Sequence, residues 1–184
     1  MSRSDPYTLP HDLPVPVDDG AADHLTGALL PDRFLPSSRG AVNVRDFTVL
    51  YVYPRTGRPG RPMLLGWDAI PGARGCTPQS CAFRDHHGQL QSLGAQVFGL
   101  STQDTRYQRE VVKRLHLPFE LLSDAAFELT DALGLPTFKV AGLTLLKRVT
   151  LVIHDGCIEK VFYPVFPPDS NAEEVIAWLA TGRG

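Results

Sequence analysis

Two cysteines five residues apart are the side chains best suited to covalent chemistry in this sequence. They bound the run Cys76-Thr77-Pro78-Gln79-Ser80-Cys81, which follows Gly75. Thr77 suits the cap of a helix, and Pro78 suits its first position, where the missing N–H would have no partner anyway. Cys76 would then lie just ahead of the first turn, where unpaired N–H groups and the helix dipole favour a negative charge. The pattern predicts a Cys76 thiolate at neutral pH.

The second cysteine of the pair, Cys81, is expected inside the same helix. Helix geometry places the two Cα atoms roughly 8.7 Å apart, which is beyond the ~7 Å limit for a disulfide. The pair can close only if the first turns of the helix unwind. We therefore expect a two-step thiol reaction that is coupled to local unfolding.

Length and composition indicate a globular protein with a redox-active thiol. The chain has 184 residues, of which 43% are hydrophobic and 21% are charged, as expected for one domain with a core. A net charge of −2 argues against nucleic-acid and membrane-surface binding. No apolar run is long enough to span a membrane, and the N-terminus does not resemble a secretion signal, so we expect a cytoplasmic protein. Three cysteines are too few for an extracellular disulfide framework.

The pattern of elements predicts an α/β fold. Residues 1–30 are rich in Pro, Asp and Gly and indicate an extended N-terminal arm, whereas residues 31–184 form the domain. Strands are expected at 47–53, 95–100, 119–122, 137–140, 147–154 and 157–163, and helices at 77–94, 104–115, 123–133 and 171–179. This alternation, which ends in a hairpin and a helix, predicts a three-layer sandwich with a mixed central sheet flanked by helices.

Five segments resemble one known family in the family's own order. They are Val49 to Pro54, Gly75 to Asp85, Val97 to Thr102, Phe119 to Asp124 and Arg148 to Gly156. The arrangement, above all Gly-Cys-Thr-x-x-x-Cys-x-Phe-Arg-Asp after a buried strand ending in Tyr-Pro, resembles the peroxiredoxins, and among them the Q type, or bacterioferritin-comigratory proteins. The resemblance implies a thioredoxin-like fold and a thiol-dependent peroxidase of hydrogen peroxide and organic hydroperoxides.

The resemblance also implies roles for individual residues. Cys76 takes the peroxidatic position and forms a sulfenic acid, Cys81 resolves it as an intramolecular disulfide, and thioredoxin or a similar dithiol reduces that disulfide. Arg148 matches the family's catalytic arginine. The peroxide-binding residues would be Pro54, Thr56, Gly75 and Thr77. No metal or organic cofactor is required, and a monomer or weak homodimer is expected.

One departure from the family pattern concerns the residues before Cys76. Peroxiredoxins carry Pro-x-x-x-Thr-x-x-Cys, but position 73 is Ala in this chain. Pro54-Arg55-Thr56 resembles the start of that motif, which indicates an insertion at about 57–74 and makes Thr56 the candidate for the missing threonine. The insertion, with Trp67, could also cover the pocket or anchor itself by packing. A smaller departure is Gln79, where the family often has an acidic residue.

Other interpretations of these residues stay open at this point. Cys76 and Cys81 could be inert buried thiols, and Arg148 could be a strand-end cation in a surface ion pair. A zinc site would need ligands beyond Cys76 and Cys81, and the remaining Cys157, beside an Asp-Gly turn, supplies no second cysteine pair. Zinc is therefore disfavoured, and Cys157 is expected to take no part in the chemistry. The chain could instead be a redox sensor, or a thiol:disulfide oxidoreductase, although the latter class favours Cys-x-x-Cys.

Overall fold

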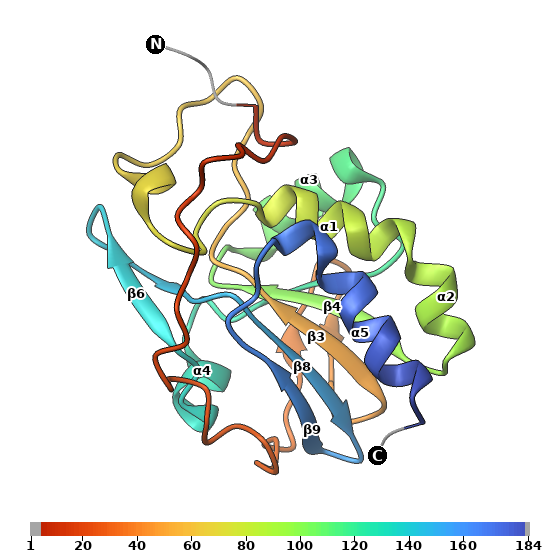
Figure 1. The fold of residues 1–184 in the computed structure, drawn as a ribbon. Helices are drawn as coiled ribbons and strands as arrows, with labels where there is room; N and C mark the ends of the chain where they lie inside the picture. Colours follow the sequence, from red (N-terminus) through yellow and green to blue (C-terminus); the bar gives the residue numbers. More distant parts are fainter. Residues whose placement is uncertain (1–4, 183–184) are drawn as a thin grey trace.

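A five-stranded mixed sheet forms the centre of the computed structural model, which describes residues 5–182 (Figure 1). The strand order is β5-β4-β3-β8-β9. The strands are β3 (Thr48–Val52), β4 (Gln96–Ser101), β5 (Leu121–Ser123), β8 (Val149–His154) and β9 (Cys157–Phe162). β3, β4 and β5 are parallel, whereas β8 runs antiparallel to both β3 and β9. The predicted mixed sheet and its terminal hairpin are confirmed.

Both faces of the sheet are covered, which gives the predicted three layers. The helices are α1 (Cys76–Asp85), α2 (His87–Ser92), α3 (Thr105–Leu115), α4 (Glu128–Leu133) and α5 (Asn171–Ala180). One hydrophobic cluster joins the sheet to α1, α2, α3 and α5, and a second joins it to α4 and the N-terminal arm. The two clusters are possible because successive side chains of β3 point to opposite faces of the sheet. Val49 and Tyr51 pack in the first cluster, and Leu50 and Val52 pack in the second.

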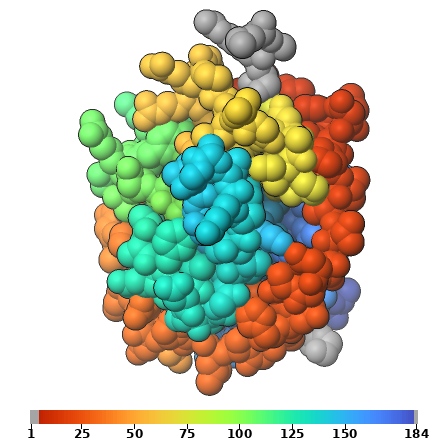
Figure 2. Space-filling model, turned by 90° about the vertical axis from the view of Figure 1, so that its left-hand side faces the viewer, coloured from red at the N-terminus to blue at the C-terminus, as the bar shows by residue number. Residues whose placement is uncertain are grey.

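Two small hairpins flank the main sheet. β1 (Leu35–Pro36) pairs with β2 (Ala41–Val42), and β6 (Thr137–Val140) pairs with β7 (Leu143–Leu146). The loop at 57–74, which was predicted to be an insertion and is called the inserted loop below, packs on the second hairpin, because Trp67 is 2% exposed and lies in one cluster with Val140 and Leu145. Figure 2 shows the loop (yellow) lying directly against this hairpin (cyan). Trp67, within the short helix η1 (Trp67–Ala69), therefore anchors the insertion by packing.

The N-terminal segment crosses the molecule along one side (Figures 1 and 2). Its only strand-like pairing within residues 5–30 is an isolated bridge from Leu29 to Cys157. Leu25 and Leu30 are nonetheless buried in the cluster with α4. Further toward the N-terminus, the arm reaches the start of α1, where Arg74 donates to the backbone carbonyl of Asp5 at 2.8 Å. The arm is thus part of both the core and the surroundings of the cysteine pair.

Two local predictions are wrong, and one strand was missed. The helix expected to run to Gly94 is interrupted at His86, so α1 and α2 are separate. Thr77 does not cap α1, because the helix already begins at Cys76 and follows Gly75. The hairpin partner β7 was not predicted, since its Leu-Thr-Leu-Leu pattern is too short to separate strand from loop. No helix formed by residues 5–182 is both long and apolar enough to cross a bilayer.

Candidate active site

Gly75 sets the position of Cys76 at the N-terminus of α1. The glycine has φ +105°, which is in the left-handed region that side chains disfavour, and the helix starts at the next residue. Cys76 is therefore the first helical residue, because the helix begins two residues earlier than predicted, and it is 3% exposed. Its sulfur lies where the free N–H groups of the first turn favour negative charge. The prediction that this thiol lies at the N-terminus of a helix is confirmed.

Arg148 brings a positive charge to this sulfur. The residue directly precedes β8 and is 4% exposed, and its Nη2 donates to Cys76 Sγ at 3.2 Å. The same nitrogen donates to the carbonyls of Ala73 and Arg74, at 3.1 Å each, and Nε donates to Gly72 O at 3.3 Å. The end of the inserted loop thus holds the guanidinium in place. Arg148 is not a surface ion-pair cation.

Gln79 completes the positioning of the guanidinium, and the sequence alone did not identify this role. Its Oε1 accepts from Arg148 Nη1, and its Nε2 donates to Asn171 Oδ1 at 3.0 Å. Asn171 Oδ1 also accepts from the Thr150 hydroxyl at 2.7 Å. All four side chains are buried. The helical spacing of three residues, which places Gln79 on the face of Cys76, was the signal available in the sequence.

The space in front of Cys76 is small. A cavity of about 10 Å³ is lined by Pro6, Arg55, Gly57, Met63, Trp67, Arg74, Gly75, Cys76 and Thr77. A volume of that order admits one water-sized group. Arg74, itself 6% exposed, is held by Asp68 at 2.8 Å and by the arm carbonyls of Asp5 and Thr8. The arm and the inserted loop therefore restrict the approach to the sulfur.

Of the other predicted peroxide-binding residues, two lie at this cavity and two do not line it. Gly75 and Thr77 line it, and Thr77 is buried. Pro54 is buried shortly after the end of β3. Thr56 is also buried, but its hydroxyl donates to Gln103 Oε1 at 3.2 Å, and its carbonyl accepts from the Tyr107 hydroxyl at 2.9 Å. Among the described residues, the hydrogen-bond partners of Thr56 are therefore Gln103 and Tyr107, and Cys76 is not one of them.

Cys81 lies in α1 with Cys76, and both thiols are free, as is Cys157 at the start of β9. Partial burial raises the pKa of the Cys81 thiol above its ordinary value, an effect that the Arg84 charge opposes. The Cys81 thiol is therefore mostly protonated at neutral pH. Within residues 5–182, no group of three His, Cys, Asp or Glu side chains is arranged to hold a metal ion.

Gly75→Ala is expected to disturb the site specifically. An added Cβ would lie 2.3 Å from Pro168 Cγ and 2.8 Å from Leu9 Cδ2, and φ +105° is unfavourable for alanine. We expect a loss of about 1–3 kcal/mol in the free energy of unfolding, measured by urea titration. The matched control is Gly88→Ala, because Gly88 lies in α2 with open space at its Cβ. That change should stabilise the chain slightly. Equal effects of the two substitutions on the free energy of unfolding would contradict the conclusion that the backbone and packing at position 75 require glycine.

Comparison with known proteins agrees with this geometry. The family model Redoxin matches residues 35–176. A chloroplastic peroxiredoxin Q of Oryza sativa subsp. japonica is 32% identical over 121 residues, which cover 65% of this chain and 55% of the relative. Peroxiredoxin bcp1 of Schizosaccharomyces pombe is 31% identical over 137 residues, covering 70% of this chain and 63% of the relative. The chain thus spans little more than half the length of these curated relatives.

Solved structures give the same result for the fold. The peroxidoxin BcpB of Mycobacterium tuberculosis aligns with a TM-score of 0.68 and 26% identity, covering 86% of this chain and 98% of the other. Peroxiredoxin Q of Xanthomonas campestris aligns with a TM-score of 0.66 and 21% identity, covering 86% and 99%. The predicted thioredoxin-like fold is confirmed. With the family model matching most of its length, the chain belongs to the redoxin family and is similar there to the Q-type peroxiredoxins.

Proposed function

We propose that this chain is a thiol-dependent peroxidase that reduces hydrogen peroxide and organic hydroperoxides at Cys76. The observation that carries the proposal is the hydrogen bond from the buried Arg148 guanidinium to Cys76 Sγ at the N-terminus of α1. A cation and free helix N–H groups at one sulfur stabilise a thiolate, and they also stabilise charge that develops on the peroxide oxygens. Inert buried cysteines would not need such an arrangement.

The first step is nucleophilic attack by the Cys76 thiolate on one peroxide oxygen. An S–O bond forms while the O–O bond breaks, so sulfur is oxidised to sulfenic acid and the leaving oxygen departs as water or an alcohol after taking a proton. Arg148 lies within hydrogen-bond distance of the sulfur and can donate to the oxygens as their charge grows. The small cavity at Cys76 has room for one oxygen-sized group next to the sulfur.

The second step joins Cys81 to the oxidised sulfur. The Cys81 thiolate attacks the sulfenic sulfur, an S–S bond forms as the S–O bond breaks, and the leaving hydroxide takes a proton from solvent to become water. Both cysteines lie in one helix, and Gln79 N donates to Gly75 O in its first turn at 3.0 Å. Closure therefore requires this turn to unwind, and with it the Gln79 contacts to Arg148 and Asn171 must break. An external dithiol, for which we propose thioredoxin, then reduces the disulfide.

The proposal is tested by following NADPH oxidation with hydrogen peroxide, thioredoxin and thioredoxin reductase. A peroxidase should reach a second-order rate constant of about 10⁴ M⁻¹ s⁻¹ or more. Replacement of thioredoxin by glutathione tests the reductant, and we expect slower turnover. If peroxide reduction is slow with every dithiol although a disulfide still forms, the chain acts as a redox sensor rather than a peroxidase.

We also propose a cytoplasmic location, which few cysteines and a reducing partner fit. For the oligomeric state we propose a monomer or weak homodimer, which sedimentation can test.

Formation of the disulfide should accelerate as the pH rises. The attacking species is the thiolate, and burial raises the pKa of Cys81, so most of this thiol is protonated near neutrality. Below that pKa the thiolate fraction, and with it the rate, should grow about tenfold per pH unit. The rate is measured by rapid acid quench after one equivalent of peroxide.

The control for this pH series is Cys81→Ser. Its sulfenic acid, trapped with dimedone, should persist at every pH because no thiol remains beside it in α1. A rate of disulfide formation that does not change between pH 6 and pH 8 would contradict the assignment of Cys81 as the attacking thiol.

A further inference from the structure

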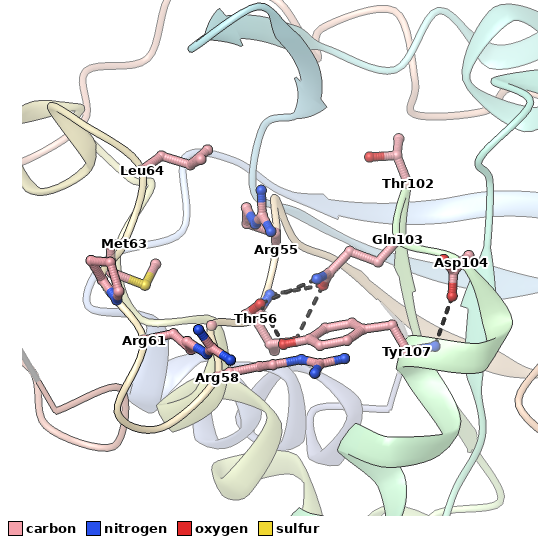
Figure 3. Close-up of a pocket in the computed structure, with 12 residues that line it drawn as sticks. Arg55, Thr56, Arg58, Arg61, Met63, Leu64, Thr102, Gln103, Asp104 and Tyr107 are labelled. Carbon is pink, nitrogen blue, oxygen red and sulfur yellow. Dashed lines mark hydrogen bonds between the residues drawn. The ribbon is translucent and has the colours of Figure 1, made fainter.

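A wide cavity lies beside the start of the inserted loop. It has a volume of about 550 Å³ and is bounded by the loop on one side and by the end of β4 and the first turn of α3 on the other (Figure 3). It is lined by Arg55, Thr56, Gly57, Arg58, Arg61, Pro62, Met63, Leu64, Thr102, Gln103, Asp104 and Tyr107. This volume is within the range that small-molecule sites occupy.

Positive charge dominates the lining. Arg55, Arg58 and Arg61 all line the cavity, and Asp104 is the single acid among the lining residues. The Asp104 carboxylate is already used, since it caps α3 by accepting from the Tyr107 N–H at 2.7 Å. None of the three arginines forms an ion pair with another residue in 5–182. Guanidinium groups in such a position bind carboxylates, often through two parallel hydrogen bonds.

The cavity adjoins the space in front of Cys76, with which it shares three lining residues. Arg55, Gly57 and Met63 line both. A molecule in the larger space would therefore lie next to the residues that enclose the sulfur. The small cavity admits only about one water-sized group, which suits the terminal oxygen of a hydroperoxide.

Apolar groups and fixed contacts shape the rest of the lining. Met63, Leu64 and the Tyr107 ring provide apolar surface, and the Arg58 guanidinium lies 5.0 Å from the centre of that ring. Figure 3 shows Arg58 extended along Tyr107, with Thr56, Gln103 and Tyr107 joined by hydrogen bonds. The buried Thr56 therefore serves as a support for this wall. Positive charge beside apolar surface suits an anionic head on a carbon chain.

We propose that this arginine-lined cavity binds the carboxylate of an organic hydroperoxide and presents its O–O group to Cys76. The inference rests on the proposed peroxidase function and names its substrate class. The reaction is the one described above: the bound hydroperoxy acid loses one oxygen to the Cys76 sulfur and leaves as a hydroxy acid once its alkoxide takes a proton. A small molecule is favoured over an acidic protein because the arginines line a hollow that adjoins the cavity at the sulfur.

The test compares two substrates that differ in one charge, a linoleic acid hydroperoxide and its methyl ester. Wild type should prefer the acid in kcat/KM by about tenfold. In Arg58→Gln/Arg61→Gln, the preference should fall close to one. Because the ratio compares two substrates in one variant, a general loss of folding or reactivity cancels.

The matched control is Arg39→Gln/Lys139→Gln. It removes the same charge from exposed residues that do not line this cavity, and it should keep the preference. Binding of octanoate to Cys76→Ser, measured by calorimetry, needs no turnover and should weaken about tenfold when the two loop arginines are replaced.

Three results would overturn this assignment. They are equal kcat/KM for acid and ester in wild type, loss of the preference in the control variant, and a higher KM for thioredoxin with an unchanged preference in the loop variant. The last would make the cavity a docking site for an acidic reductant. Failure of hydrogen peroxide turnover with octanoate binding intact would refute the peroxidase function and leave the anion site.

Discussion

Cys76→Ser is expected to abolish peroxide consumption. The serine hydroxyl is far less nucleophilic than a thiolate at neutral pH and cannot form a sulfenic acid. The loss should be at least about a thousandfold, which is the scale for removal of an activated nucleophile. Turnover is followed as NADPH oxidation with thioredoxin and its reductase, and in parallel as direct loss of hydrogen peroxide.

Cys157→Ser is the matched control for this substitution. Cys157 is also a free thiol, but it begins β9, and among the described residues its sulfur contacts only its neighbour's carbonyl, Ile158 O, at 4.0 Å. The variant should consume peroxide at the wild-type rate. Peroxide consumption that survives in Cys76→Ser but disappears in Cys157→Ser would move the nucleophile to β9 and overturn the proposed site.

Arg148→Met should lower the rate constant of Cys76 with hydrogen peroxide by about 10²–10³-fold, since removal of one preorganised donor to a developing negative charge costs that much in other enzymes. The side chain keeps a similar apolar stem, but the donors to Cys76 Sγ and to the carbonyls of residues 72–74 disappear. The rate is measured by stopped flow under single-turnover conditions, which separates attack on peroxide from reduction of the disulfide.

Two further measurements separate chemistry from folding in this prediction. Arg148→Lys keeps the charge but not the planar group that reaches the sulfur and Gln79 together, so it should recover only part of the rate. Alkylation of Cys76 by iodoacetamide at pH 7 should slow in Arg148→Met, because the cation no longer stabilises the thiolate. A variant that folds normally and reacts with both reagents at the wild-type rate would contradict the role of Arg148.

Much of the fold could be predicted from local patterns. The apolar run at 47–53 became β3, and the Asp-Gly turn at 155–156 joins β8 to β9. These predictions succeeded because a buried strand needs alternating contacts on two faces and a tight hairpin needs specific turn residues. Thr77 was misplaced as a cap because a left-handed glycine can start a helix without any side-chain cap, and Gly75 does so.

The site was predictable in its chemistry but not in its long-range contacts. The cysteine spacing and the resemblance identified Cys76, Cys81 and Arg148. The Gln79 link to Arg148, the approach of the arm and the shared cavity depend on residues far apart in sequence, and no local pattern encodes them. The sequence also made Thr56 the candidate for the family threonine that position 73 lacks. The Thr56 hydroxyl contacts Gln103, and Thr56 does not line the cavity at Cys76.

The central claim is that Cys76 is oxidised by peroxide and resolved by Cys81 within one chain. The most direct measurement treats the reduced protein with one equivalent of hydrogen peroxide, quenches with acid, alkylates free thiols and maps the peptides by mass spectrometry. We expect a Cys76–Cys81 disulfide with Cys157 alkylated. A disulfide that includes Cys157, or a Cys76 that remains fully alkylated after peroxide, would contradict it.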